Sequence, residues 1–224
     1  SKRICSLFVT IMSLYLFIKM RIEETKICGG TLREIAVGGH EAFSKSEGFL
    51  GHEPKLVYPI FIGEDVKRKA TEWKKKNADM VMIEVIKETP EDVIVEDILK
   101  VIEVWDKAFC IGVPKTGMLE CVLSVCDNLK PLINAVSYDR LEALEIVEDY
   151  ECPVIVQGNS IGELRSLVQK VLSRGGDDIV LEVPVYPIGR GFDTTLEMIL
   201  EIRSLASQDE LLRYPIFVAP VSAY

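Results

Sequence analysis

The sequence predicts an α/β fold of the TIM-type (β/α) barrel class, preceded by a short β-hairpin. From residue 56 onward, short apolar runs alternate with amphipathic helical patterns. The apolar runs lack an inside–outside alternation, which is typical of parallel strands that helices cover on their faces. The unit recurs every roughly 20 to 30 residues without a G-x-G-x-x-G loop after the first strand, which favours a barrel over a doubly wound sheet.

Length and composition limit the chain to one sizeable core. Its 224 residues are 48% hydrophobic, enough for one α/β domain with an appendage. We divide it into an apolar N-terminal segment (1–19), a β-hairpin flap with a linker (20–55) and the barrel (56–224).

The N-terminal segment contains an uncharged run of fifteen residues, Ile4–Ile18, between Arg3 and Lys19. A membrane span needs about 20 apolar residues, and a signal peptide would add a small-residue cleavage site. Three interpretations stay open: a short membrane anchor, an apolar segment packed on the domain, or an artefact of gene-start choice, with Met20 as the true first residue.

A hairpin is predicted over Thr25–Phe43. Gly29-Gly30 and Gly38-Gly39 separate short alternating runs there, as turn glycines do in hairpins. A polar linker through Pro54 follows. We expect an N-terminal flap.

The barrel region contains seven expected strands and six expected helices. The strands are LVYPIFIG, DMVMIEVI, AFCIGV, PLINAV, PVIVQ, DIVLEV and YPIFVAPV. The helices between them are one centred on Trp73 and then PEDVIVEDILKVIEVWD, MLECVLSVCDNL, DRLEALEIVEDY, SIGELRSLVQKVLSRGG and TTLEMILEIRSLA. Each helix has one apolar stripe, such as Ile94, Ile98 and Val101. Since the sequence stops at the seventh strand, we expect a barrel incomplete at its C-terminus, or one closed by a partner or by the N-terminal segment.

Charge and cysteine content exclude several function classes. Twenty-six basic against 35 acidic residues give a net charge of −9, which argues against nucleic acid as a partner. The six cysteines form no C-x-x-C pair, and this favours a reducing cytoplasm. His40 and His52 have no metal-ligand spacing, so no metal site is predicted. No nucleophile or P-loop motif is present, and no catalytic residue is assigned.

Candidate binding residues follow from the rule that a barrel functions through the loops after its strands. Asn134 and Gln157 end two otherwise apolar strands, and Asn159 follows closely. A buried amide must find partners, so these side chains either read the amide-like edge of a pterin, flank a corrinoid, or cap loop backbone. The same rule selects Glu64, Asp65, Glu84, Lys87, Lys115, Ser137, Glu182 and Ser222.

The loop after the sixth strand holds two further candidates, Tyr186 and Arg190. Gly189 and Gly191 permit positive φ, and the following helix directs its N-terminal amides into the same space. An anion or the polar tail of a cofactor would fit there, whereas the alternative is a plain connection with a solvated Arg190.

Glu84 and Glu182 are a further pair to weigh. They could face each other across the mouth of the barrel. The commoner interpretation, which we favour here, is that they are two solvent-exposed loop glutamates.

Three stretches resemble the barrel domain of the large (gamma) subunit of the corrinoid/iron–sulfur protein of acetyl-CoA decarbonylase/synthase. They are LREIAVGGHEAF, KPLINAVSYDRLEALEIVEDYECPVIVQ, and the segment from DDIVLEVPVYPIGRGFDTTLEMILEIRSLA to LLRYPIFVAPVSAY. The resemblance covers Thr31 to Tyr224 and is strongest from Lys130 onward.

This resemblance implies a role in methyl transfer between a tetrahydropterin and acetyl-CoA synthase. It implies a corrinoid (cobamide) cofactor, a second barrel subunit as partner, and transient contact with acetyl-CoA synthase and a methyltransferase. The barrel would act by shielding and positioning, as a component of the complex rather than as an independent catalyst.

The sequence departs from the family at several points, and two of them bear on the cofactor. Cys5 and Cys28 are too few for a [4Fe–4S] cluster on this chain. The Asp-Pro-Gly expected after the sixth strand is replaced by Glu182-Val183-Pro184. Two alternatives therefore stay open: a pterin-binding methyltransferase or dihydropteroate-synthase-like enzyme, and a truncated barrel without activity.

Overall fold

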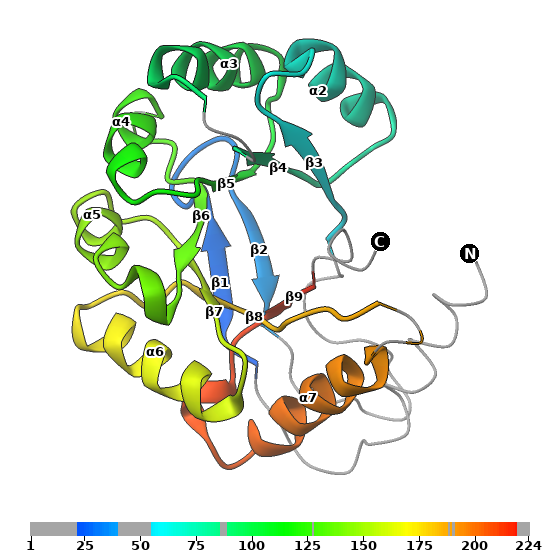
Figure 1. The fold of residues 1–224 in the computed structure, drawn as a ribbon, viewed down its shortest axis with the longest axis vertical. Helices are drawn as coiled ribbons and strands as arrows, with labels where there is room; N and C mark the ends of the chain where they lie inside the picture. The colour runs from blue at the N-terminus through cyan, green and yellow to red at the C-terminus, as the bar shows by residue number, and fades with distance from the viewer. Residues whose placement is uncertain are drawn as a thin grey trace.

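A curled sheet of seven parallel strands forms the centre of the molecule (Figure 1). This computed structural model describes residues 22–39, 55–85, 89–126, 128–187, 189 and 191–218. The strands are β3 (Val57–Phe61), β4 (Met80–Glu84), β5 (Phe109–Gly112), β6 (Leu132–Val136), β7 (Val154–Gln157), β8 (Ile179–Glu182) and β9 (Ile216–Phe217). Each strand pairs with its neighbour in sequence, which is the winding of a barrel and not of a doubly wound sheet. The predicted TIM-type class is confirmed.

Six α-helices of the described residues follow the strands in turn and lie around the outside of the sheet (Figure 1). They are α2 (Val66–Lys75), α3 (Glu91–Val104), α4 (Gly117–Val125), α5 (Ala143–Asp149), α6 (Ile161–Ser173) and α7 (Phe192–Leu205). Two short 3-10 helices, η1 (Tyr138–Arg140) and η2 (Glu210–Leu212), interrupt the loops.

Local signals in the sequence explain where α6 begins and which face it buries. The Ser160 hydroxyl accepts a hydrogen bond from the Glu163 amide at 3.2 Å, while the Glu163 carboxylate accepts from the Asn159 amide at 2.8 Å. These bonds satisfy amides that the first turn leaves without partners. Leu164, Val168 and further residues at helical spacing are buried against the sheet.

The core lies on both faces of the strands. Residues Met80–Ile83 of β4 are all buried, as are the first three residues of β5. Trp105 is fully buried at the end of α3, where its indole N–H donates to the Ala108 carbonyl at 2.9 Å. Each such apolar side chain contributes about 1.5–3 kcal/mol.

Strand β3 lies at one edge of the sheet and contains Pro59. The Pro59 carbonyl accepts a hydrogen bond from the indole N–H of Trp73, in α2, at 3.0 Å. Tyr58 stacks on the same Trp73 ring, with centroids 4.6 Å apart. Among the described residues β3 pairs with β4 alone and β9 with β8 alone, so the sheet stays open between them.

The predicted N-terminal hairpin is present as β1 (Glu24–Ile27) and β2 (Ile35–Gly38), paired antiparallel. The Thr25 hydroxyl donates to the Ile179 carbonyl at 2.5 Å, and the Lys26 amide donates to the Asp178 carboxylate at 2.7 Å. Both acceptors lie where β8 begins.

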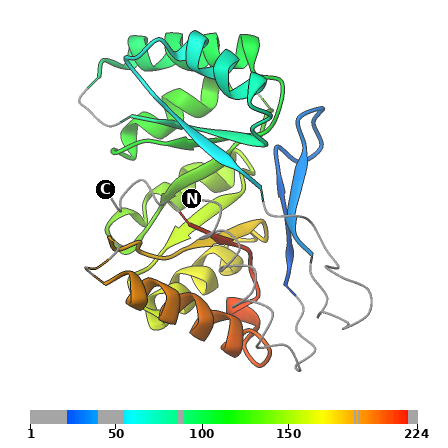
Figure 2. The ribbon, with the colours of Figure 1, turned by 90° about the vertical axis from the view of Figure 1, so that its right-hand side faces the viewer.

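Further contacts place the hairpin across the N-terminal ends of the strands. The Arg33 guanidinium, at the hairpin tip, donates to the carbonyls of Trp105 at 2.5 Å and Ile102 at 3.0 Å, ahead of β5. The Cys28 amide donates to the Lys130 carbonyl ahead of β6 at 3.0 Å. Figure 2 shows the hairpin as a separate layer beside the barrel. The expected flap therefore covers the end opposite the functional loops.

The apolar run Ile4–Ile18 lies outside the described residues and stays a prediction, as do the domain boundaries. Within the described part of the chain, no helix has the length and apolar character needed to cross a bilayer.

A glycine pair tests how closely the hairpin packs on the barrel. Gly38 has φ +82°, and a Cβ there would lie 2.2 Å from the Glu23 carbonyl oxygen and 2.8 Å from Pro215 Cγ. Gly30 has φ +75° and no atom within 4 Å of the same position. We expect Gly38→Ala to lower the free energy of unfolding by about 1–3 kcal/mol more than Gly30→Ala. Both variants strain the backbone, but only the new methyl group at position 38 clashes with neighbouring atoms. Urea unfolding followed by circular dichroism measures this, and equal losses would contradict it.

Candidate functional site

The candidate site is the mouth formed by the C-terminal ends of the strands. The hairpin occupies the opposite end, and in barrels of this class the loops after the strands build the functional face. Polar side chains end β4, β7 and β8, whose preceding residues are buried and apolar.

Sheet register brings three strand ends together on one side of the mouth. Glu84 pairs with Gly112, and Gly112 pairs with Asn134. A Cβ added at Gly112 would lie 3.6 Å from Glu84 Cγ and 4.0 Å from Asn134 Cβ. Met82 Cε lies 3.6 Å from the same position, so these three side chains leave room at Gly112 for about one methyl group.

Two carboxyl groups, Glu84 at the end of β4 and Glu182 at the end of β8, lie close enough to repel each other. Glu182 is 7% exposed, and within the described part of the chain its Oε2 has no hydrogen-bond partner. Burial, and next the nearby Glu84 carboxylate, raise the pKa of Glu182 to about 7. Burial also raises the pKa of Glu84, which is half-buried. The solvent-exposed interpretation that we favoured for these two glutamates is wrong, because both lie against the barrel interior.

A thiol lies beneath the two carboxyls. Cys110 is 1% exposed in β5, and burial, then Glu182 and Glu84, raise its pKa well above the ordinary thiol value. Because the thiolate is the nucleophilic form, this cysteine acts as a small apolar side chain and not as a nucleophile.

The predicted amides lie at different depths. Asn134 is half-buried beside Gly112. Gln157 is exposed at the end of β7 and pairs in register with Glu182. Asn159 is exposed, and its backbone amide binds Glu163 at the start of α6. The sheet register thus places Asn134 in line with Glu84 and Gln157 beside Glu182. Asn159 lies instead in the loop that starts α6.

The loop between β8 and α7 is fixed by one buried hydroxyl. Thr195 is 1% exposed; its Oγ1 donates to the Pro184 carbonyl at 3.0 Å and accepts from the Tyr186 amide at 3.0 Å. Gly191, at φ +109°, lies against the Tyr186 ring, since a Cβ there would be 3.5 Å from Tyr186 Cγ. Tyr186 stays 40% exposed at the rim. Arg190, the other predicted residue of this loop, lies outside the described residues.

The mouth can bind a polar heterocycle or an amide-bearing ligand. Near neutral pH Glu182 exchanges between a protonated donor and a carboxylate acceptor, and Asn134 and Gln157 supply both functions. Across the described residues, no group of three or more His, Cys, Asp or Glu side chains is placed to hold a metal ion.

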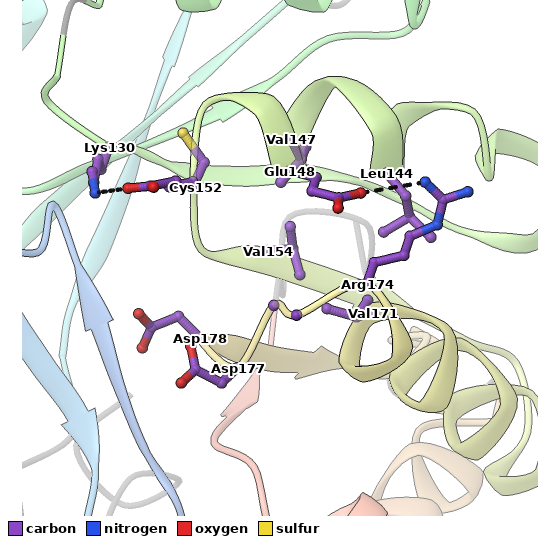
Figure 3. A pocket seen from close by; sticks show the side chains of 13 residues that line it. Lys130, Leu144, Val147, Glu148, Cys152, Val154, Val171, Arg174, Asp177 and Asp178 are labelled. Atoms are coloured by element: carbon purple, nitrogen blue, oxygen red, sulfur yellow. Dashed lines mark hydrogen bonds and ion pairs between the residues drawn. The ribbon is translucent and has the colours of Figure 1, made fainter.

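A separate cavity of about 440 Å³ lies between α5 and α6 at the start of β7 and β8 (Figure 3). Lys130 pairs with Glu151 at 2.6 Å, and Arg174 approaches Glu148 at 3.4 Å. Asp178, which binds the hairpin, also lines it. Because it opens at the N-terminal ends of the strands, where barrels build stability, we do not take it as the candidate site.

Comparison with known sequences gives one family. The family model described as CO dehydrogenase/acetyl-CoA synthase delta subunit matches residues 59–224. The acetyl-CoA decarbonylase/synthase complex subunit gamma of Methanosarcina acetivorans is 32% identical over 119 residues, which are 52% of this chain and 25% of the relative. The subunit gamma of Methanocaldococcus jannaschii is 22% identical over 215 residues, which are 88% of this chain and 43% of the relative. The chain therefore spans less than half of these relatives.

Solved structures with the same architecture include dihydropteroate synthases. The Xanthomonas albilineans enzyme with 4-aminobenzoic acid has a TM-score of 0.59 at 14% identity, covering 87% of this chain and 76% of that chain. The Thermus thermophilus enzyme in complex with 6HMPPP has a TM-score of 0.58 at 16% identity, covering 89% of this chain and 77% of that chain. At these identities the likeness shows the fold alone.

Replacing Glu182 with Gln should change how stability depends on pH. Below pH 4.5, the ordinary value, the carboxyl is protonated in both folded and unfolded chains, so its ionisation does not change the free energy of unfolding. Between 4.5 and about 7 the unfolded chain loses this proton first, so the wild type is destabilised by up to about 3 kcal/mol as pH rises. We expect Glu182→Gln to be more stable than the wild type at pH 8 and similar at pH 4. Urea unfolding across this range measures it, with the exposed Glu64→Gln as control. A constant difference at every pH would contradict the prediction.

Replacing Thr195 with Val should loosen the rim loop. The variant keeps the shape of the side chain but leaves the Pro184 carbonyl and the Tyr186 amide without partners, at a cost of about 1–3 kcal/mol. Thermal unfolding and amide hydrogen exchange at Tyr186 measure the effect. The neighbouring Thr194→Val, at an exposed position, is the matched control, and equal behaviour of the two variants would refute the assignment.

Proposed function

Because the chain belongs to the CO dehydrogenase/acetyl-CoA synthase delta subunit family, we propose that its barrel takes part in methyl-group transfer between a tetrahydropterin and acetyl-CoA synthase. It acts as a component of the complex and works in the cytoplasm. The observation that carries this proposal is the family match over residues 59–224, which includes every strand end at the mouth.

The proposed role is to shield and position a cofactor, without bond-making by this chain. The mouth residues described above are amides, carboxyls and apolar groups, and the Cys110 thiol is held protonated. Such a lining supports hydrogen bonding and exclusion of water from a reactive centre held by a cofactor.

The cofactor we propose is a corrinoid, which this mouth binds by itself and which a partner subunit then encloses. A bound cobamide would supply the cobalt that carries the methyl group. The buried Glu182 Oε2 has no hydrogen-bond partner among the described residues, so a ligand amide would satisfy it. Asn134, Gln157 and Asn159 would bind further ligand amides, with Tyr186 and Arg190 at the rim.

The partners we propose follow from the relatives, which are named as subunits of a complex. A second barrel subunit would bind stably, and acetyl-CoA synthase and a methyltransferase would bind transiently while the methyl group is exchanged.

A second candidate is a pterin-binding enzyme. A carboxyl beside an amide at the mouth favours it, on a fold that this chain shares with dihydropteroate synthases. Carboxyl and amide groups match the alternating donors and acceptors on the edge of a pterin.

Titration of the purified chain with a cobamide and, separately, with a methyltetrahydropterin separates these functions. We expect cobamide binding at micromolar concentration, weakened at least about tenfold in an Asn134→Ala/Gln157→Ala variant that loses two hydrogen bonds. The control variant Gln169→Ala/Gln208→Ala removes two exposed amides away from the mouth.

The outcomes are distinct. Pterin binding without cobamide binding would favour the second candidate. Equal affinity in the wild type and both double variants would show that the mouth serves neither function. Binding of neither ligand would refute the proposed cofactor.

A further inference from the structure

Tyr186 is an exposed aromatic side chain at the rim of the mouth. In the described part of the chain, the exposed aromatic side chains are Tyr138, at 44%, and Tyr186, at 40%. The ammonium of Lys170 lies over the Tyr138 ring, 5.0 Å from its centroid. Tyr186 instead lies in the loop that leaves β8 after Glu182, on the functional side. The rim therefore presents an aromatic ring on the same side of the barrel as the amides and carboxyls.

The backbone at Tyr186 is held in place by several restraints. The buried Thr195 hydroxyl accepts a hydrogen bond from the Tyr186 amide and donates one to the Pro184 carbonyl, each at 3.0 Å. Pro187 follows directly, and a residue before proline is confined to extended conformations. Pro184 has its own φ fixed by its ring. Tyr186 is thus fixed against the first turn of α7.

Gly191 supports the ring from one side. A Cβ built on this residue would lie 3.5 Å from Tyr186 Cγ and 3.9 Å from Tyr186 Cδ2. The lack of a side chain, at φ +109°, lets the Gly191 backbone pack directly on the ring. A larger residue there would strain the backbone and press on the ring as well. The chain therefore covers part of the Tyr186 ring and leaves the rest open to a ligand.

A single exposed aromatic side chain is common on protein surfaces and by itself indicates nothing. Tyr186 differs because both its backbone and its ring are held. A tyrosine that is free to rotate loses this freedom when a ligand binds, and the loss weakens binding. A ring that is already fixed loses little, and offset stacking on it adds affinity beyond the apolar area that it buries. These features favour a binding role over a plain surface position.

We propose that Tyr186 is a stacking platform: the flat face of a conjugated ring system in the mouth ligand packs against the part of the tyrosine ring that Gly191 leaves open. This inference rests on the function proposed for the mouth and deepens it, because it gives the candidate residues separate tasks. Asn134 and Gln157 hydrogen-bond the polar edge of the ligand, whereas Tyr186 binds its face and sets its orientation. The corrin of a cobamide and the ring of a pterin share this chemistry.

The test is titration of the full chain with a cobamide and, separately, with a methyltetrahydropterin. For the ligand that binds, we expect Tyr186→Leu to weaken affinity about three- to tenfold, because leucine keeps the apolar bulk but cannot stack. Tyr186→Phe should stay within about twofold of the wild type, since stacking needs the ring and not the hydroxyl. Tyr138→Leu is the matched control and should bind as the wild type does, because Lys170 already lies over that ring.

A second variant tests whether the platform must be held. Thr195→Val should weaken binding about threefold in the wild-type background, because it releases the Tyr186 backbone. In the Tyr186→Leu background it should have no further effect on affinity, since the platform is already gone. A purely structural role of Thr195 would instead lower the affinity by the same factor in both backgrounds. Circular dichroism checks that each variant is folded at the temperature of the titration.

The results separate the platform from the function on which it rests. Unchanged affinity in Tyr186→Leu, an equal loss in Tyr186→Phe, or the same loss in Tyr138→Leu would overturn the platform and leave the function of the mouth standing. A loss in Tyr186→Leu confined to the cobamide or to the pterin would support the platform and identify which ring stacks on it. Binding of neither ligand to the wild type would overturn the proposed cofactor and the platform together.

Discussion

Hydrogen bonding between parallel strands that are buried on both faces is the constraint on which the rest of this structure depends. It demands apolar side chains along nearly the whole length of each strand, so helices must cover the outer surface. Polar groups are then confined to strand ends. The hairpin covers one set of ends through hydrogen bonds to backbone carbonyls in β8 and ahead of β5 and β6. The opposite set of ends holds the carboxyls and amides.

Sequence pattern alone predicted the seven strands, the six helices and the hairpin, because periodicity and turn glycines are local signals. It did not predict which end the hairpin covers. Thr25 contacts Ile179, 154 residues away, and no local pattern encodes such a contact. The site was predicted only in part. Asn134 can be found locally, because it is an amide in an otherwise apolar strand. The burial of Glu84 and Glu182 depends on register across the sheet, which the local pattern does not give.

The mouth keeps groups that oppose its own stability. Glu182 has a carboxyl oxygen without a hydrogen-bond partner among the described residues, and the nearby Glu84 carries the same charge. Gly112 lacks a side chain where there is room for a methyl group between β4 and β6. Arg140 adds a second unsatisfied group on the same side of the barrel. Such local conflicts amid a well-packed core are typical of surfaces shaped for binding, because a ligand can satisfy what the chain leaves open.

Pro59 has a consequence for the behaviour of the chain at high concentration. An edge strand presents donors and acceptors that can recruit strands from other molecules and start aggregation. In the middle of β3 the proline offers no N–H, and its carbonyl is already bound to the Trp73 indole. A strand added there would find a break in the ladder at its centre. Pro59 and Trp73 therefore disfavour the pairing of this edge strand with strands of other molecules, and they do so without a charged residue on the strand itself.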